Sequence, residues 1–134
     1  MTRLRLVGKE ARTLRAAIFE RSIAKCDLCG VGIREDDFEL HHRLTRSGQG
    51  PDSHANCVVL HSVCHKMVHA NPKGSYDNGF LVSRYHDPET TPLLLHRREW
   101  VYATDHGFIP VEEVGGRASS FQPATRPNFG GEAA

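Results

Sequence analysis

The sequence lacks long hydrophobic runs, and aromatic residues make up only 7% of its 134 residues. No apolar run exceeds four residues, as in Ala16–Phe19 and Cys57–Leu60. A transmembrane helix needs about 20 mostly apolar residues, and the core of a secretory signal needs about 7 or more. Neither is expected, so we predict a cytoplasmic protein with one domain and a modest hydrophobic core.

The chain also has little net charge, because 17 Lys and Arg residues stand against 16 Asp and Glu, giving +1. By itself this balance argues against nucleic-acid binding. The charge is uneven, however: residues 1–25 carry seven basic and two acidic side chains, whereas the segments 26–69 and 70–134 each have a net charge of −2. The sequence therefore predicts a basic N-terminal arm whose residues, such as Arg12 and Arg15, contact the phosphate backbone of DNA.

Histidine and cysteine, in contrast, are abundant. All four cysteines and six of the nine histidines lie between Cys26 and His69. In a reducing cytoplasm, cysteines interleaved with histidines are metal ligands more often than disulfide partners. Cys26 and Cys29 are also too close together to cross-link distant parts of a fold. We therefore expect a metal centre.

Two pairs of residues with the same two-residue gap predict a structural zinc site. Gly30 permits the tight turn that brings the thiolates of the first pair to one ion. The second pair lies at positions i and i+3 on the first turn of a helix expected at residues 61–70. The predicted ligands are Cys26, Cys29, His61 and Cys64. Cys57 is the alternative to His61, although its apolar neighbours also suit a small buried hydrophobic residue.

A second metal position is expected on the same helix. His65 and His69 are four residues apart, so they share a helix face and can bind one cation. His41 and His42 are neighbours at a short strand expected at residues 38–41, so their side chains point to opposite faces. One of them can join the helix histidines while the other faces solvent or substrate, and strand parity leaves open which.

Four segments, considered together, are similar to a known family. They are Cys26-x2-Cys29, Leu40-His41-His42-Arg43, Asn56 and His61-x2-Cys64-His65-x3-His69. In order and spacing they resemble the HNH endonuclease family, in the zinc-stapled variety of the ββα-metal nuclease fold. The resemblance implies an α+β fold class: a small ββα-metal domain with a structural zinc, an N-terminal helix and a short β extension. The remainder of the chain is more weakly similar to small stand-alone HNH proteins of bacteriophages and their actinobacterial hosts.

The resemblance implies a role for each matching residue. His42 resembles the general base that takes a proton from the attacking water, and His41 resembles a ligand of the catalytic divalent ion. Asn56 resembles the residue whose amide fixes the loop between strand and helix and so orients the base. His65 resembles the next metal ligand, and His69 resembles a ligand or a phosphate contact.

One residue departs from the family pattern, because zinc-stapled members usually carry cysteine where this chain has His61. Mixed Cys and His ligands are nevertheless ordinary for zinc. The catalytic ion is expected to be Mg2+, Mn2+, Ni2+ or Zn2+, with nitrogen ligands favouring the later transition metals. Arg43 and Arg46 flank the base and the following loop, where either is a candidate phosphate contact.

The resemblance thus implies a metal-dependent endonuclease that hydrolyses phosphodiester bonds of double-stranded DNA with a histidine general base and one divalent ion, and the chemistry of these residue types is consistent with it. The alternatives are a non-catalytic zinc-stabilised DNA-binding module and a ribonuclease. The similarity to phage proteins adds phage packaging proteins as expected partners and a bacterial or phage-infected host cell as the expected location. We expect a monomer or weak dimer with no membrane partner.

Composition, periodicity and the resemblance together divide the chain into four expected parts. They are a basic strand and helix arm at residues 1–25, the HNH core at 26–72, a β extension packed on the core at 73–114, and a disordered tail at 115–134. Within these parts, a helix is expected at 9–25 and strands at 2–7, 80–85, 93–96 and 100–103.

Overall fold

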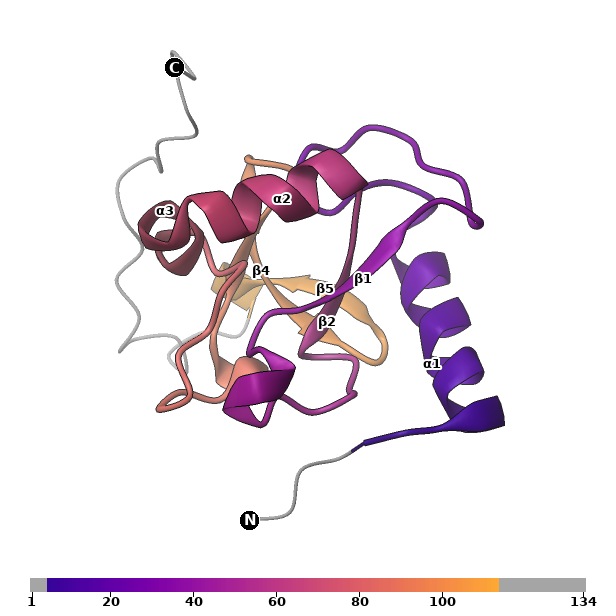
Figure 1. Cartoon of the computed structure of the whole chain (residues 1–134). Helices are drawn as coiled ribbons and strands as arrows, with labels where there is room; N and C mark the ends of the chain where they lie inside the picture. The colour runs from indigo at the N-terminus through magenta and orange to yellow at the C-terminus, as the bar shows by residue number, and fades with distance from the viewer. Residues whose placement is uncertain (1–4, 114–134) are drawn as a thin grey trace.

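The computed structural model describes residues 5–113, and it combines helices with two small sheets (Figure 1). The elements, in chain order, are α1 (Gly8–Arg21), β1 (Glu39–His42), the 3-10 helix η1 (Arg46–Gly48), β2 (Cys57–Leu60), α2 (Ser62–Ala70), α3 (Pro72–Asp77), the 3-10 helix η2 (Pro88–Thr90), β3 (Leu93–Leu95), β4 (Glu99–Thr104) and β5 (Gly107–Pro110). This mixture of helix and sheet confirms the predicted α+β class. The tail expected at 115–134 lies outside the described residues.

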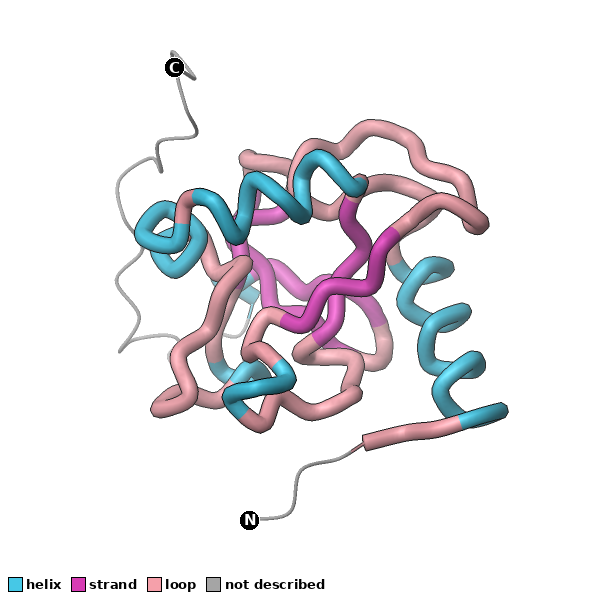
Figure 2. Tube along the Cα trace, in the orientation of Figure 1, coloured by secondary structure: helices cyan, strands magenta, loops and turns pink. Residues whose placement is uncertain are grey.

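The two sheets are antiparallel. Strands β1 and β2 pair with each other, and β3, β4 and β5 form a separate three-stranded sheet in that order. Figure 2 shows the strands at the centre of the molecule, with helices and long loops around them. Helix α2 follows β2 after one residue and packs on both β1 and β2. The segment β1-β2-α2 is therefore a ββα unit.

Strand β2 is buried on both faces, which explains its run of four apolar residues. Val58 and Leu60 belong to a core with α2 and the three-stranded sheet, whereas Cys57 and Val59 belong to a core with α1. Successive side chains of a strand point to opposite faces, so a strand between two layers must be apolar throughout. Helices α1 and α2 accordingly cover opposite faces of the β1–β2 pair (Figure 1).

The predicted N-terminal elements are partly wrong. The helix ends at Arg21 instead of continuing to residue 25, because Ile23 and Ala24 have positive φ angles of 56° and 55°. These left-handed residues turn the chain so that Lys25 bridges to Gly32 across the predicted zinc loop. Residues 5–7, part of the strand expected at 2–7, form no strand in the described structure.

The C-terminal region also differs from the prediction. The expected strand at 80–85 is a loop. The side chains of its apolar residues Phe80–Val82 are buried, but their backbone amides donate to separate segments and not to a neighbouring strand. The Leu81 amide donates to Ser75 O, and the Val82 amide donates to Arg43 O. The strands expected at 93–96 and 100–103 correspond to β3 and β4, whereas α3 and β5 were not predicted.

Candidate metal centres and histidine site

The four predicted zinc ligands lie together. The ligand atoms of Cys26, Cys29, His61 and Cys64 all lie within 4.8 Å of one another. The first pair stands on a tight turn, in which the Gly30 amide donates to Cys26 O at 2.8 Å and Gly30 has a φ of +79°. Glycine adopts this left-handed conformation without a steric penalty, so Gly30, directly after the second cysteine, permits the turn.

The contacts of His61 favour metal ligation through Nδ1. Its Nε2 donates to Gly32 O at 3.2 Å, which leaves Nδ1 unprotonated, and Nδ1 lies 3.4 Å from Cys29 Sγ. A hydrogen bond with Cys64 is the main cause that lowers the pKa of Cys26. Three sulfur atoms and one imidazole nitrogen are a donor set that tetrahedral zinc prefers. The residues present therefore fit a structural zinc ion.

Cys57, the alternative ligand, is not part of this group. Its Sγ lies 4.0 Å from Pro51 O, and its side chain belongs to the core under α1. Burial raises the pKa of the Cys57 thiol to about 11, so it stays protonated at neutral pH. The structure thus places His61, and not Cys57, beside the other three cysteines.

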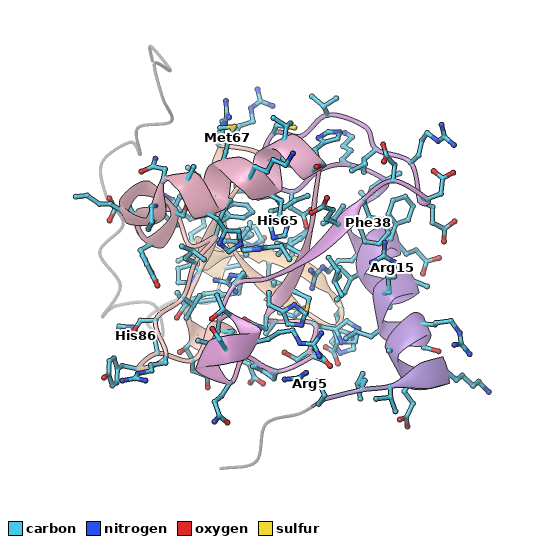
Figure 3. The ribbon with its side chains drawn as sticks, in the orientation of Figure 1. Arg5, Arg15, Phe38, His65, Met67 and His86 are labelled. Atoms are coloured by element: carbon cyan, nitrogen blue, oxygen red, sulfur yellow. The ribbon has the colours of Figure 1, made fainter. Side chains whose placement is uncertain are left out.

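Three further histidines converge between β1 and α2. The ligand nitrogens of His41, His65 and His69 lie within 4.8 Å of one another, and the ring centroids are 4.9 to 5.4 Å apart. His65 and His69 share one face of α2, and Figure 3 shows His65 between this helix and β1. His41 pairs with Val58 and so points to the α2 side of the strand, whereas His42 points to the other side. The structure thereby decides what strand parity had left open.

In two of these rings, one nitrogen makes a hydrogen bond and the other is left to bind a metal ion. His41 Nε2 donates to Phe80 O at 2.6 Å, and His65 Nδ1 donates to Glu39 Oε1 at 2.5 Å. Burial lowers the pKa of His41 to about 3, so its ring is neutral at physiological pH. Neutral imidazoles held by a carbonyl or carboxylate at the opposite nitrogen are typical ligands of divalent ions. The group therefore fits a second metal position.

His42 makes a different contact, with an acidic residue that no sequence motif singled out. Its Nε2 donates to Asp52 Oδ1 at 2.7 Å. The side chains are 12% and 11% exposed, so this pair is largely shielded from water. The second oxygen of Asp52 accepts the main-chain amide of Leu6 at 2.8 Å.

Asn56 joins the two chain segments that carry this pair. Its Oδ1 accepts the Leu44 amide at 2.7 Å, and its Nδ2 donates to Leu44 O and Pro51 O, both at 3.0 Å. Leu44 lies two residues after His42, and Pro51 directly precedes Asp52. The buried amide therefore ties the chain after His42 to the residue before Asp52, within the loop between β1 and β2. The resemblance had instead implied the loop between strand and helix.

The expectation that Arg43 contacts phosphate is wrong, because its side chain has no exposed surface. Within residues 5–113, its guanidinium donates to the main-chain oxygens of Ala55, Gly79, Pro88, Thr91 and Pro92. Burial lowers the pKa of Arg43 to about 9, so the group remains charged at neutral pH. Arg43 thus holds the loop 79–92 beside β1, and this loop supplies the Phe80 carbonyl to His41.

The other three predicted phosphate contacts are exposed. Arg46 lies at the start of η1, and Arg12 and Arg15 lie on the outer face of α1. Arg15 also donates to Phe38 O at 2.9 Å, and its guanidinium lies 3.9 Å from the centroid of the Phe38 ring (Figure 3). These two contacts limit the freedom of the Arg15 side chain to reach a phosphate.

The partners of the histidines were missed because no spacing rule identifies them. Asp52 is ten residues from His42, Glu39 is 26 residues from His65, and Phe80 acts through its main-chain oxygen. Only the cross-strand register and the path of the loops bring these groups together. Only Glu39 gave a sequence signal for such a partner, because it is an acidic residue two positions before a histidine in a strand.

Comparison with known proteins agrees with this geometry. Residues 26–71 match the family model described as HNH endonuclease. No curated protein and no solved structure gives a significant match to the chain. Within residues 5–113, no helix has the length and apolar character needed to cross a membrane. HNH domains are generally nuclease domains that bind nucleic acid and use metal ions, and the match confirms the resemblance to the HNH endonuclease family for residues 26–71.

Proposed function

We propose that this protein is a metal-dependent endonuclease that hydrolyses phosphodiester bonds in double-stranded DNA. The observation that carries the proposal is the convergence of three histidine nitrogens within 4.8 Å, from β1 and α2, inside the segment that matches the HNH family. A structural zinc domain needs only the cysteine-rich site. The additional histidines, with their individually paired rings, favour catalysis over the non-catalytic alternative.

The proposed division of roles follows from the hydrogen bonds. His42 is the general base, because Nε2 is occupied by Asp52 and Nδ1 remains to accept a proton from water. His41, His65 and His69 hold the divalent ion, Mg2+, Mn2+, Ni2+ or Zn2+. When bound there, such an ion polarises the scissile phosphate and stabilises the leaving oxygen. Asn56 keeps the loop that follows the base in place.

The cysteine-rich site has a separate, structural role in this proposal. Cys26, Cys29, His61 and Cys64 bind Zn2+, which ties the loop after α1 to the N-terminal end of α2. His65 and His69 lie on the same helix, so the zinc also sets the position of two ligands of the second ion. A core of this size gains folding free energy from such an ion.

The proposed substrate contacts are the exposed Arg46, Arg12 and Arg15, which would bind phosphates and weaken with added salt. We further propose that the protein acts in the cytoplasm of a bacterial or phage-infected cell, with phage packaging proteins as partners, as a monomer or weak dimer. The packaging partners and the type of cell follow from the weaker resemblance to phage HNH proteins.

Cleavage of supercoiled plasmid DNA tests the proposal. Zinc-loaded protein supplied with each of the four divalent ions should nick or cut the plasmid, and His42→Ala should abolish cleavage while retaining about one zinc per chain. His106→Ala is the matched control, because His106 lies in an exposed turn between β4 and β5. Binding without cleavage would favour the DNA-binding module, and cleavage of structured RNA alone would favour the ribonuclease.

A further inference from the structure

A carboxylate links the proposed general base to the N-terminal segment. Asp52 Oδ1 accepts His42 Nε2–H at 2.7 Å, and Asp52 Oδ2 accepts the Leu6 amide at 2.8 Å. Each carboxylate oxygen thus has its own donor, and the donors come from segments 36 residues apart in sequence. Asp52 as a whole is 8% exposed, so water competes little for either oxygen.

Building on the proposed function, we propose that Asp52 is a positioning residue for His42 and that the main-chain amide of Leu6 holds Asp52 in place. The N-terminal segment at residues 5–7 then completes the active site. An ionised carboxylate can only accept hydrogen bonds, so the proton of the neutral ring must sit on Nε2. Nδ1 is left as the acceptor for the proton of the attacking water, and the carboxylate stabilises the imidazolium that forms.

The charge state of Asp52 agrees with this role. Burial raises the pKa of the carboxyl, but the hydrogen bonds from His42 and from the Leu6 amide outweigh burial and hold the pKa below its usual value. The group is therefore ionised at any pH at which the enzyme would be assayed. A protonated carboxyl could donate to the ring and reverse the tautomer, and the two donors prevent this.

The packing of Leu6 explains how an amide from the N-terminal segment reaches the site. The Leu6 side chain packs against the core formed by α1 and β2, which fixes the backbone next to the β1–β2 loop. The same segment leads into α1 and its exposed Arg12. A phosphate contact by this basic arm and the orientation of the base therefore depend on one stretch of backbone.

Substitution by asparagine gives a sharp test, because the two donors need two acceptors and an amide offers one. In Asp52→Asn, the amide oxygen can serve His42 or Leu6, but not both. If it serves Leu6, the amide nitrogen faces His42 Nε2 and drives the ring proton to Nδ1, which removes the base. Leu6→Pro deletes the competing donor, whereas Leu6→Ala shortens the side chain and keeps it.

The expected result is a loss of kcat for plasmid nicking by about 10- to 100-fold in Asp52→Asn and Asp52→Ala, with KM and zinc content little changed. Asp36→Asn, at an exposed aspartate paired with Arg34, should behave as the wild type. Asp52→Asn should cost less in the Leu6→Pro background than alone, because the amide oxygen is then free for His42. Leu6→Ala should retain more activity than Leu6→Pro.

A ring resonance supplies a readout that does not depend on activity. In zinc-loaded, 15N-labelled protein above pH 7.5, His42 Nε2–H should give a downfield proton signal protected from exchange, which Asp52→Ala removes and Asp36→Asn retains. A signal that persists in Asp52→Ala, or wild-type kcat in both Asp52 variants, would overturn the proposal. If wild-type protein cleaves no DNA, the proposed function fails, while the ring signal still tests the Asp52–His42 contact.

Discussion

The exchange of Asn56 for aspartate tests how the loop between β1 and β2 is held. The aspartate has almost the same shape, and its oxygen can still accept the Leu44 amide, which Asn56 accepts at 2.7 Å. The substitution removes both hydrogen atoms that Nδ2 donates to Leu44 O and Pro51 O at 3.0 Å. Asn56 has no exposed surface, so water does not replace these donors.

The magnitude follows from the two carbonyls that lose the Asn56 amide, of which Pro51 O keeps the weak thiol donor of Cys57 at 4.0 Å. Each buried carbonyl that loses its donor costs about 1 to 3 kcal/mol, so two carbonyls lower the free energy of unfolding by about 2 to 6 kcal/mol. The total stability of a small domain is about 5 to 15 kcal/mol, so Asn56→Asp should be among the more damaging single changes. The loss should shrink as pH falls through the raised pKa of the buried carboxyl, because the protonated group regains one donor.

Urea unfolding of the zinc-loaded protein, followed by the fluorescence of the single Trp100, measures this difference. Asn71→Asp is the matched control, since Asn71 is exposed and caps α3 by accepting the Gly74 amide. Asparagine and aspartate are about equally good at that position, so the control should change stability by less than about 0.5 kcal/mol. A loss of less than about 1 kcal/mol for Asn56→Asp would refute the reasoning. In the folded fraction, kcat should also fall, because the segments that carry His42 and Asp52 are no longer tied together.

Three further substitutions test other parts of the structure. Arg43→Lys offers three donors to five carbonyls, of which Pro88 O also accepts the Thr91 amide, so at least one carbonyl loses its donor. The free energy of unfolding should fall by about 1 to 3 kcal/mol or more in urea titrations, whereas the exposed Arg34→Lys should leave it unchanged. In elemental analysis, Cys57→Ala should keep one zinc per chain, whereas His61→Ala should lose tightly held zinc. Loss of zinc from the Cys57 variant would instead identify Cys57 as the fourth zinc ligand. Glu39→Ala removes the carboxylate that holds the His65 ring, so calorimetry should show Mn2+ binding weakened by about 10-fold or more. Unchanged affinity would mean that the carboxylate does not orient the ring. Glu35→Ala, at an exposed glutamate, is the control.

Local patterns in the sequence identified the elements that depend on short-range geometry. The helix at residues 61–70 was expected from its composition, and α2 occupies Ser62–Ala70. The helix expected at 9–25 was too long, because nothing local shows that residues 23 and 24 must turn left-handed to pair Lys25 with Gly32. The strand expected at 80–85 failed for a related reason. An apolar triplet lines a core equally well as a loop when its backbone groups find partners elsewhere.

The behaviour of the arginines illustrates a limit of charge counting. Arg43 and Arg46 are three residues apart in the same segment, yet one has no exposed surface and the other lies on the surface. The inward direction of Arg43 depends on five carbonyls, four of which come from a loop 36 to 49 residues away. Their arrangement is a property of the folded chain, and a sequence window around Arg43 contains no sign of it.

The sequence by itself determined which residues are able to bind metal, because the spacings Cys26-x2-Cys29, His61-x2-Cys64 and His65-x3-His69 place side chains together through the geometry of one turn or one helix face. The tertiary structure decided which neighbour completes each group. It turned His41 toward α2 and His42 toward Asp52, and it brought Leu6 to the same carboxylate. The physical reason is that helix periodicity acts over a few residues, whereas strand register and loop paths depend on how two cores pack against β2.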